Sequence, residues 1–199
     1  MGYYTRVLAT LEDCNSLALL SDALEESGSR ASLEIGEGDA VDWDLLLLKH
    51  ENGADIASIE RNLVSEGSLA QEELREFTAE LAEAKPASGA RWLRTFFPRV
   101  RCVYTFQHLG GTRLKGGFEA LTTVRNSIWS RGSAIFQADG EGFSNEEGYH
   151  ILWQFADPVD GKWWVAVQEK GKWTHFQMDL GNPEHRDAFC RGKVPPDLA

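Results

Sequence analysis

The chain has 199 residues, of which 42% are hydrophobic and 26% charged, with a formal net charge of −11. This length and composition are typical of one folded domain, or of two small halves that share a core, and they exclude an intrinsically disordered chain. The acidic balance disfavours nonspecific nucleic-acid binding, which depends on neutralising phosphates. No apolar run approaches the roughly 18 residues of a membrane span, so we expect neither nucleic acid nor membrane as a partner.

The cysteines and the N-terminus show no sign of export. The three cysteines, Cys14, Cys102 and Cys190, are odd in number and far apart, which argues against a disulfide framework and against a zinc knuckle. The segment from Met1 to Ala9 lacks the run of about 7–15 apolar residues that a signal peptide needs. We therefore expect a cytoplasmic protein with reduced thiols.

Charge is unevenly distributed along the chain. Residues 12–86 hold 19 acidic side chains against five basic ones, whereas residues 87–133 hold eight basic side chains against Glu119 alone. Such segments usually compensate each other within a fold. The acidic segment could instead meet a basic protein partner, because complementary charge speeds an encounter. A second copy of the chain, giving a homodimer, is another candidate partner.

The first half of the chain predicts the element order β-α-β-β-β-α, with the last helix broken in two. Asn52-Gly53 between two apolar runs is a strong hairpin signal, and Ser68 to Gln71 matches a capping box at the start of a helix. The expected strands are 3–9, 31–35, 43–50 and 54–61, and the expected helices are 16–26, 68–84 and 88–97.

The second half predicts a similar order with one added strand, and the chain as a whole predicts an α+β fold. The expected strands are 101–108, 134–139, 149–155, 162–168 and 173–179, and the expected helices are 118–131 and 182–190. We predict two similar βαβββ-type units, 1–98 and 99–199, that pack as one compact body with mainly antiparallel sheet. An internal duplication is a hypothesis, since the halves share little residue identity.

One polar side of the predicted sheet is the best candidate for a binding site. Five of the six glutamines fall one per predicted strand: Gln107, Gln137, Gln154, Gln168 and Gln177. Alternation places further polar and aromatic residues on the same side, namely His150, Trp164, Trp173, His175 and Asp179, while the opposite side is apolar.

This polar-aromatic side suits a flat polar ligand such as a sugar, a nucleoside or a peptide. An indole ring can stack on an apolar plane, and a glutamine amide offers a donor and an acceptor together. We expect noncatalytic binding of a small polar ligand, or of a protein partner, with the histidines tuning the site with pH. The expected ligand-binding residues are Gln137, Gln154, Gln177, Trp173, His150 and His175. The alternative is that the glutamines are half-solvated and the tryptophans pack under a helix.

An enzyme is the competing interpretation. Asp139, Glu141 and Glu147 lie in an acidic, glycine-rich loop close in sequence to His150, so a lyase or hydrolase could use them, with or without a divalent metal. The loop fails the EF-hand register because Phe143 takes its fifth position. No histidine spacing indicates a metal site, and no cofactor is identified. The alternative is a solvated hairpin tip.

A second glycine-rich loop, residues 108–117, joins a predicted strand to a predicted helix. Backbone amides at a helix start attract anions, and Arg113 and Lys115 would add positive charge. The Walker spacing is broken, however, because Gly117 stands where that motif requires lysine. The loop is therefore either an anion-binding site or a flexible surface connection.

Overall fold

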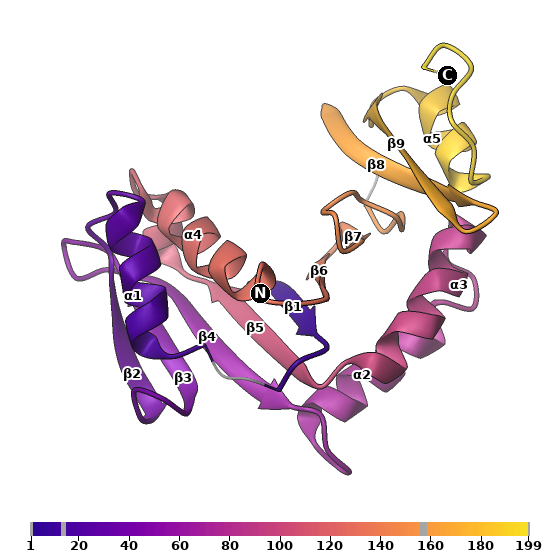
Figure 1. Ribbon diagram of the computed structural model, residues 1–199. Helices are drawn as coiled ribbons and strands as arrows, with labels where there is room; N and C mark the ends of the chain where they lie inside the picture. Colours follow the sequence, from indigo (N-terminus) through magenta and orange to yellow (C-terminus); the bar gives the residue numbers. More distant parts are fainter. Residues whose placement is uncertain (1, 13–14, 156–158, 199) are drawn as a thin grey trace. The chain divides into compact units, whose positions relative to one another are not determined.

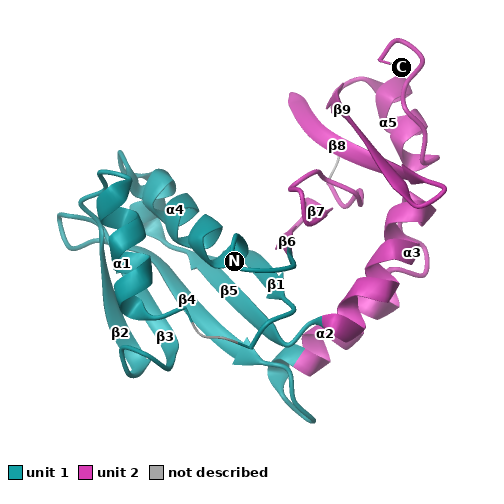
Figure 2. Cartoon of the chain, viewed as in Figure 1, with its two compact units in different colours: residues 1–70, 100–134 teal, residues 71–99, 135–199 magenta. Residues whose placement is uncertain are grey.

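The structure is a computed structural model that describes residues 2–12, 15–155 and 159–198 (Figure 1). It divides into two compact units, each built from two separate segments of the chain (Figure 2). Unit 1 comprises residues 1–70 and 100–134, and unit 2 comprises residues 71–99 and 135–199. The predicted boundary at residues 98/99 divides the sequence into halves, whereas the compact units interleave along it. Cys14, one of the predicted reduced cysteines, lies outside the described residues.

Unit 1 is an antiparallel sheet with two helices on one face (Figure 1). Its five strands lie in the order β2-β3-β4-β5-β1. The elements are β1 (Tyr3–Ala9), α1 (Leu17–Glu26), β2 (Ser32–Gly38), β3 (Trp43–Lys49), β4 (Asp55–Leu63), β5 (Cys102–His108), the 3-10 helix η2 (Gly110–Arg113) and α4 (Gly117–Trp129).

Local sequence signals account for several of these elements. The β3–β4 hairpin turns at Gly53, whose φ of 86° suits glycine, and the Ala54 carbonyl accepts from the His50 amide at 2.8 Å. Helix α1 begins where the Ser16 hydroxyl accepts from the Leu19 amide. The register aligns Leu46, Ile59 and Phe106 on one face, and burial of these side chains against the helices stabilises the sheet.

Unit 2 combines helices with two antiparallel hairpins. Its elements are α2 (Leu69–Glu80, which begins at the unit boundary), α3 (Ala87–Phe96), the 3-10 helix η1 (Phe97–Arg99), β6 (Ala134–Ala138), β7 (Gly142–Ser144), β8 (Lys162–Glu169), β9 (Lys172–Asp179) and α5 (Pro183–Cys190). Strands β8 and β9 form a two-stranded sheet of their own. Its inner side packs with Leu180 and Phe189 into one apolar cluster, so the hairpin has one side in the core.

The α+β class with mainly antiparallel sheet is confirmed, and the internal repeat is not confirmed, because the two units have different element orders. The predicted strand 149–155 is wrong. Ile151 and Leu152 are adjacent and both buried, which the alternation of a one-sided strand does not allow, and His150 makes only isolated bridges to Ser144 and Val165. No helix in the described part of the chain is long and apolar enough to cross a membrane.

Candidate functional site

The predicted glutamines do not all lie on one sheet. Gln107 lies on β5 of unit 1. Gln137 lies on β6, Gln168 on β8 and Gln177 on β9, whereas Gln154 lies outside any strand. Gln137 is buried, and the Gln154 side-chain amide donates to the Glu80 carboxylate of α2 at 3.1 Å. Gln168 and Gln177 share one side of the β8–β9 sheet, whereas β5 and β6 belong to the other sheet.

The β8–β9 hairpin does show the predicted alternation. Val165, Phe176 and Met178 point into the core of unit 2 and are almost fully buried. On the opposite side, Trp164 is 52% exposed and forms a cross-strand pair with the exposed Gln177. This side of the hairpin is therefore an accessible surface.

Three rings and one amide form the accessible surface, which we call the aromatic face: Tyr149, Trp164, His175 and Gln177. The rings of Tyr149 and His175 stack with centroids 4.4 Å apart and an interplanar angle of 3°. The Trp164 ring lies 6.1 Å from His175 and 6.2 Å from Tyr149. The Trp164 ring is tilted by 56° to His175 and by 58° to Tyr149, so the exposed indole offers its own plane beside the stacked pair, and an indole plane with hydrogen-bonding groups beside it suits planar polar molecules.

Of the two tryptophans on this side of the hairpin, Trp173 is the less accessible. Its ring meets the ring of Trp92 of α3 edge-on, with centroids 5.5 Å apart, and its side chain is half-buried. Trp173 thus packs against a helix, as the alternative interpretation of the tryptophans expected. Sequence reasoning placed Trp164 on the correct side but did not include it among the binding residues, because no local pattern shows which end of the hairpin α3 covers.

His150 lies in the core and not on the aromatic face. It is 2% exposed, and its ring lies 5.0 Å from that of Phe155, 6.2 Å from Trp163 and 6.3 Å from Phe189. Burial lowers the pKa of the imidazole to about 3, opposed by a hydrogen bond with the Leu152 backbone. The Nε2 atom has no hydrogen-bond partner. His150 is therefore a neutral core residue at physiological pH.

The carboxylates proposed for catalysis are not assembled around His150. Asp139 and Glu141 are half-buried and Glu147 is exposed, and within the described ranges none of the three interacts with the His150 ring. The acidic loop is not a solvated tip either, since its Phe143 is 1% exposed and belongs to β7. Among the described residues there is no group of three or more His, Cys, Asp or Glu that could hold a metal ion.

The glycine-rich loop of unit 1 is shaped by close packing. A Cβ on Gly117 would lie 2.1 Å from the Gly111 carbonyl oxygen, and a Cβ on Gly111 would lie 2.7 Å from the Asp55 carbonyl oxygen, so both glycines are needed where η2 meets α4. Arg113 is exposed on η2, whereas Lys115 lies at the edge of a cleft. The two predicted anion-binding residues therefore do not line the same cavity.

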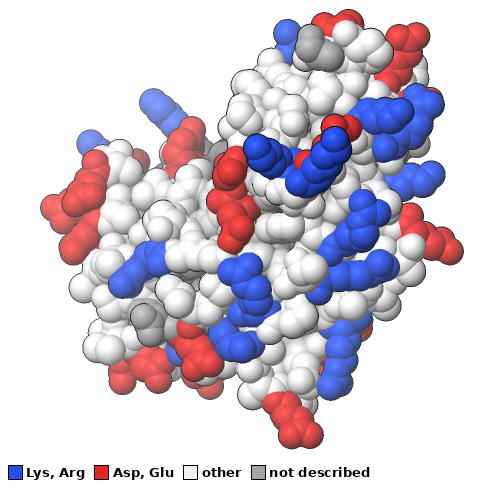
Figure 3. Space-filling model, turned by 45° about the vertical axis from the view of Figure 1, so that its right-hand side comes forward, with Lys and Arg blue, Asp and Glu red and all other residues white. Residues whose placement is uncertain are grey.

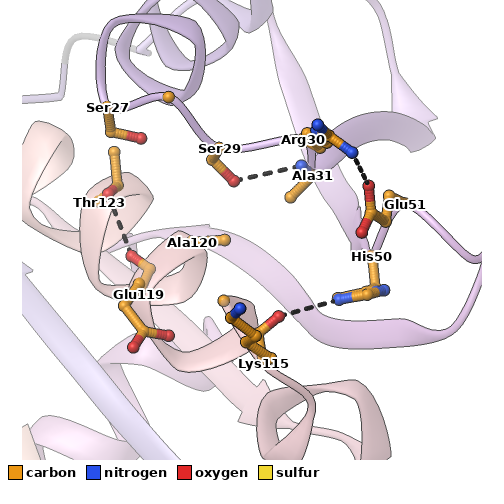
Figure 4. Close-up of a pocket in the computed structure, with 12 residues that line it drawn as sticks. Ser27, Ser29, Arg30, Ala31, His50, Glu51, Lys115, Glu119, Ala120 and Thr123 are labelled. Atoms are coloured by element: carbon orange, nitrogen blue, oxygen red, sulfur yellow. Dashed lines mark hydrogen bonds and ion pairs between the residues drawn. The ribbon is translucent and has the colours of Figure 1, made fainter.

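That cleft has a volume of about 640 Å³ and lies wholly within unit 1 (Figure 4). It is formed by the segment after α1, by the β3–β4 turn and by the start of α4. Figure 4 shows Arg30, His50 and Glu51 along one wall, and Ser27, Thr123 and Glu119 along the other, with Lys115 between them. Sequence reasoning missed the cleft, because its lining comes from three loops without a shared motif.

The helices of unit 2 carry exposed charges of both signs. Figure 3 shows Lys and Arg side chains along the side of unit 2 on which α2 and α3 lie, and the exposed arginines of these helices are Arg75, Arg91 and Arg94. Exposed glutamates, such as Glu72 and Glu76, flank Arg75 in α2, whereas α3 contains no acidic residue.

Comparisons of the chain with protein-family models, with curated proteins and with solved structures find no match in any of the three.

Proposed function

We propose that this protein binds a small, flat polar ligand, or a planar side chain of a partner protein, on the aromatic face of unit 2 and does not catalyse a reaction. The observation that carries the proposal is the exposed indole of Trp164 beside the stacked rings of Tyr149 and His175. A ligand ring or peptide plane laid on Trp164 would have the Gln177 amide within the same face.

The energetics favour such a contact. A tryptophan side chain buries about 150–250 Å² when it is covered, and apolar burial contributes about 25 cal/mol per Å². Covering the exposed half of Trp164 would therefore contribute about 2–3 kcal/mol to binding. Hydrogen bonds to Gln177 would add orientation more than affinity, because they replace bonds to water.

Ligand-observed NMR tests the proposal with a panel of nucleosides, disaccharides and short peptides. We expect at least one class to give saturation-transfer signals that disappear in Trp164→Ala. The matched control is Phe118→Ala, which removes another exposed aromatic ring, 53% exposed, from unit 1. Equal signals from Trp164→Ala and the unaltered protein would refute a ligand site on the aromatic face.

The other interpretations have weaker support. A lyase or hydrolase that uses Asp139, Glu141, Glu147 and His150 would require these groups to interact, and a His150 imidazole with a pKa of about 3 is a poor base near neutral pH. A homodimer would appear as concentration-dependent mass in sedimentation equilibrium. A reducing compartment such as the cytoplasm suits the protein, because the two described cysteines, Cys102 and Cys190, are in the thiol form and not in a disulfide.

A further inference from the structure

The cleft in unit 1 holds one positive and one negative side chain that are not paired. Across the described residues, neither the Lys115 ammonium nor the Glu119 carboxylate takes part in a salt bridge. Arg30 and Glu51, by contrast, compensate each other across 3.2 Å on the opposite wall. After that pair is set aside, the cleft presents a single free cation and a single free anion to a ligand.

The backbone around Lys115 is held in place. The His50 ring can donate from Nε2 to the Lys115 carbonyl oxygen at 3.1 Å, while its Nδ1 accepts from the Asn52 amide at 3.3 Å. The bond to Lys115 joins the β3–β4 turn to the loop before α4 (Figure 4), and the bond from Asn52 holds the ring within the turn. A site that is ordered before the ligand arrives loses less entropy on binding.

Small residues and hydroxyl groups make up much of the remaining lining. Ala31 and Ala120 leave room between the walls, and Ser29 and Thr123 bring hydroxyl groups to the cleft. The Ser29 oxygen accepts from the Ala31 amide, which leaves its own hydrogen free to donate. The volume of about 640 Å³ lies within the range of small-molecule sites and exceeds what one free amino acid needs.

We propose that this cleft binds a short peptide with free termini, whose carboxylate pairs with Lys115 and whose ammonium pairs with Glu119. A simple anion would be opposed by Glu119, and a simple cation would be opposed by Lys115. A zwitterion satisfies both charges with charge-assisted hydrogen bonds, and the peptide groups between its ends can bond to the serine and threonine hydroxyls. This site is separate from the aromatic face and does not depend on it.

Triglycine is the probe, because it carries both terminal charges and no side chain. In ¹H–¹⁵N correlation spectra we expect triglycine to shift the amides of Ala31, Gly116 and Ala120 in a saturable manner. N-acetyl-triglycine lacks the ammonium and triglycine amide lacks the carboxylate, so each is expected to bind at least tenfold more weakly. Absence of saturable shifts at the solubility limit, or equal affinity for the three peptides, would overturn the proposal.

Two substitutions assign the charges. In Lys115→Met, triglycine and triglycine amide should bind equally while the preference for a free ammonium persists. In Glu119→Gln, triglycine and its N-acetyl form should bind equally while the preference for a free carboxylate persists. The controls Lys193→Met and Glu184→Gln remove the same charges from exposed positions in unit 2. An equal loss in the controls would show that net charge governs binding, and no loss in the cleft variants would show that Lys115 and Glu119 do not bind the peptide; either result would overturn the proposal. Trp164→Ala should leave triglycine binding unchanged, which keeps this test distinct from that of the aromatic face.

Discussion

Acid should destabilise unit 2 through His150, and replacing this residue by phenylalanine should remove the effect. The folded-state pKa of about 3 lies below the ordinary histidine pKa of 6.5 that an unfolded chain approaches. Between these two values the unfolded state binds a proton that the folded state does not. Stability is therefore unaffected by this group above pH 6.5 and falls as the pH drops toward 3, by about 1.4 kcal/mol per pH unit.

The size of the effect makes it measurable. From pH 6.5 to pH 4.5 the loss from His150 is about 2–3 kcal/mol, a large part of the roughly 5–15 kcal/mol that stabilises an ordinary domain. In His150→Phe a ring of similar shape stays among Phe155, Trp163 and Phe189, and the unpartnered Nε2 atom is removed. The variant also loses the hydrogen bond with the Leu152 backbone, which should cost about 1–3 kcal/mol at every pH. The diagnostic quantity is therefore the loss of stability between pH 7 and pH 4.5, which should be about 2–3 kcal/mol smaller in the variant than in the unaltered protein.

Urea unfolding followed by tryptophan fluorescence at pH 7.0, 5.5 and 4.5 is the assay. It reports mainly on unit 2, which contains five of the seven tryptophans: Trp92, Trp153, Trp163, Trp164 and Trp173. His175→Phe, at an exposed position of the same unit, is the matched control and should retain the acid sensitivity of the unaltered protein. Parallel losses of stability in the unaltered protein and in His150→Phe would refute the reasoning.

Two further predictions concern unit 1. Gly117→Ala should destabilise the protein by more than about 2 kcal/mol, because its Cβ would lie 2.1 Å from the Gly111 carbonyl oxygen. The control Gly110→Ala should be nearly neutral, because its Cβ would meet nothing within 4 Å. Thermal unfolding compares the two variants, and equal midpoints would contradict the packing argument. Asp42→Ala should lower the free energy of unfolding by about 1 kcal/mol, since its carboxylate lies 2.6 Å from the buried guanidinium of Arg61. Asp44→Ala should lower it less, because the Asp44 carboxylate lies 4.0 Å from the same group. Urea unfolding measures both, and a larger loss in Asp44→Ala would refute Asp42 as the main partner of Arg61.

The elements that local sequence determines could be predicted. The β8–β9 hairpin follows from the alternation on both sides of Lys170-Gly171, where the φ of 81° at Gly171 is one that glycine adopts readily. Helix α3 ends next to Pro98 as expected, and the strand after Asn52-Gly53 is β4. In each case the signal lies within about ten residues, so no long-range contact has to be known.

The parts that tertiary packing determines could not be predicted. The stretch 149–155 has the alternation of a strand, yet packing buries both Ile151 and Leu152 and places His150 among aromatic rings. The expected position of His150 beside the glutamines was lost with that strand. The exposure of Trp164 depends on where α3 lies, and the cleft depends on three loops brought together by the sheet, so neither leaves a periodic trace in the sequence.

The interleaving of the two units constrains how the chain can fold during synthesis. Strand β5 is bonded to both β4 and β1 but leaves the ribosome about 40 residues after β4, once α2 and α3 have been made. Until then β1 has no neighbour in the sheet of unit 1, and the edge of β4 that will bond to β5 has unpaired backbone groups. A fragment that stops at residue 98 should for this reason be prone to aggregation, and expression of unit 1 alone would require joining residue 70 to residue 100 by a short linker.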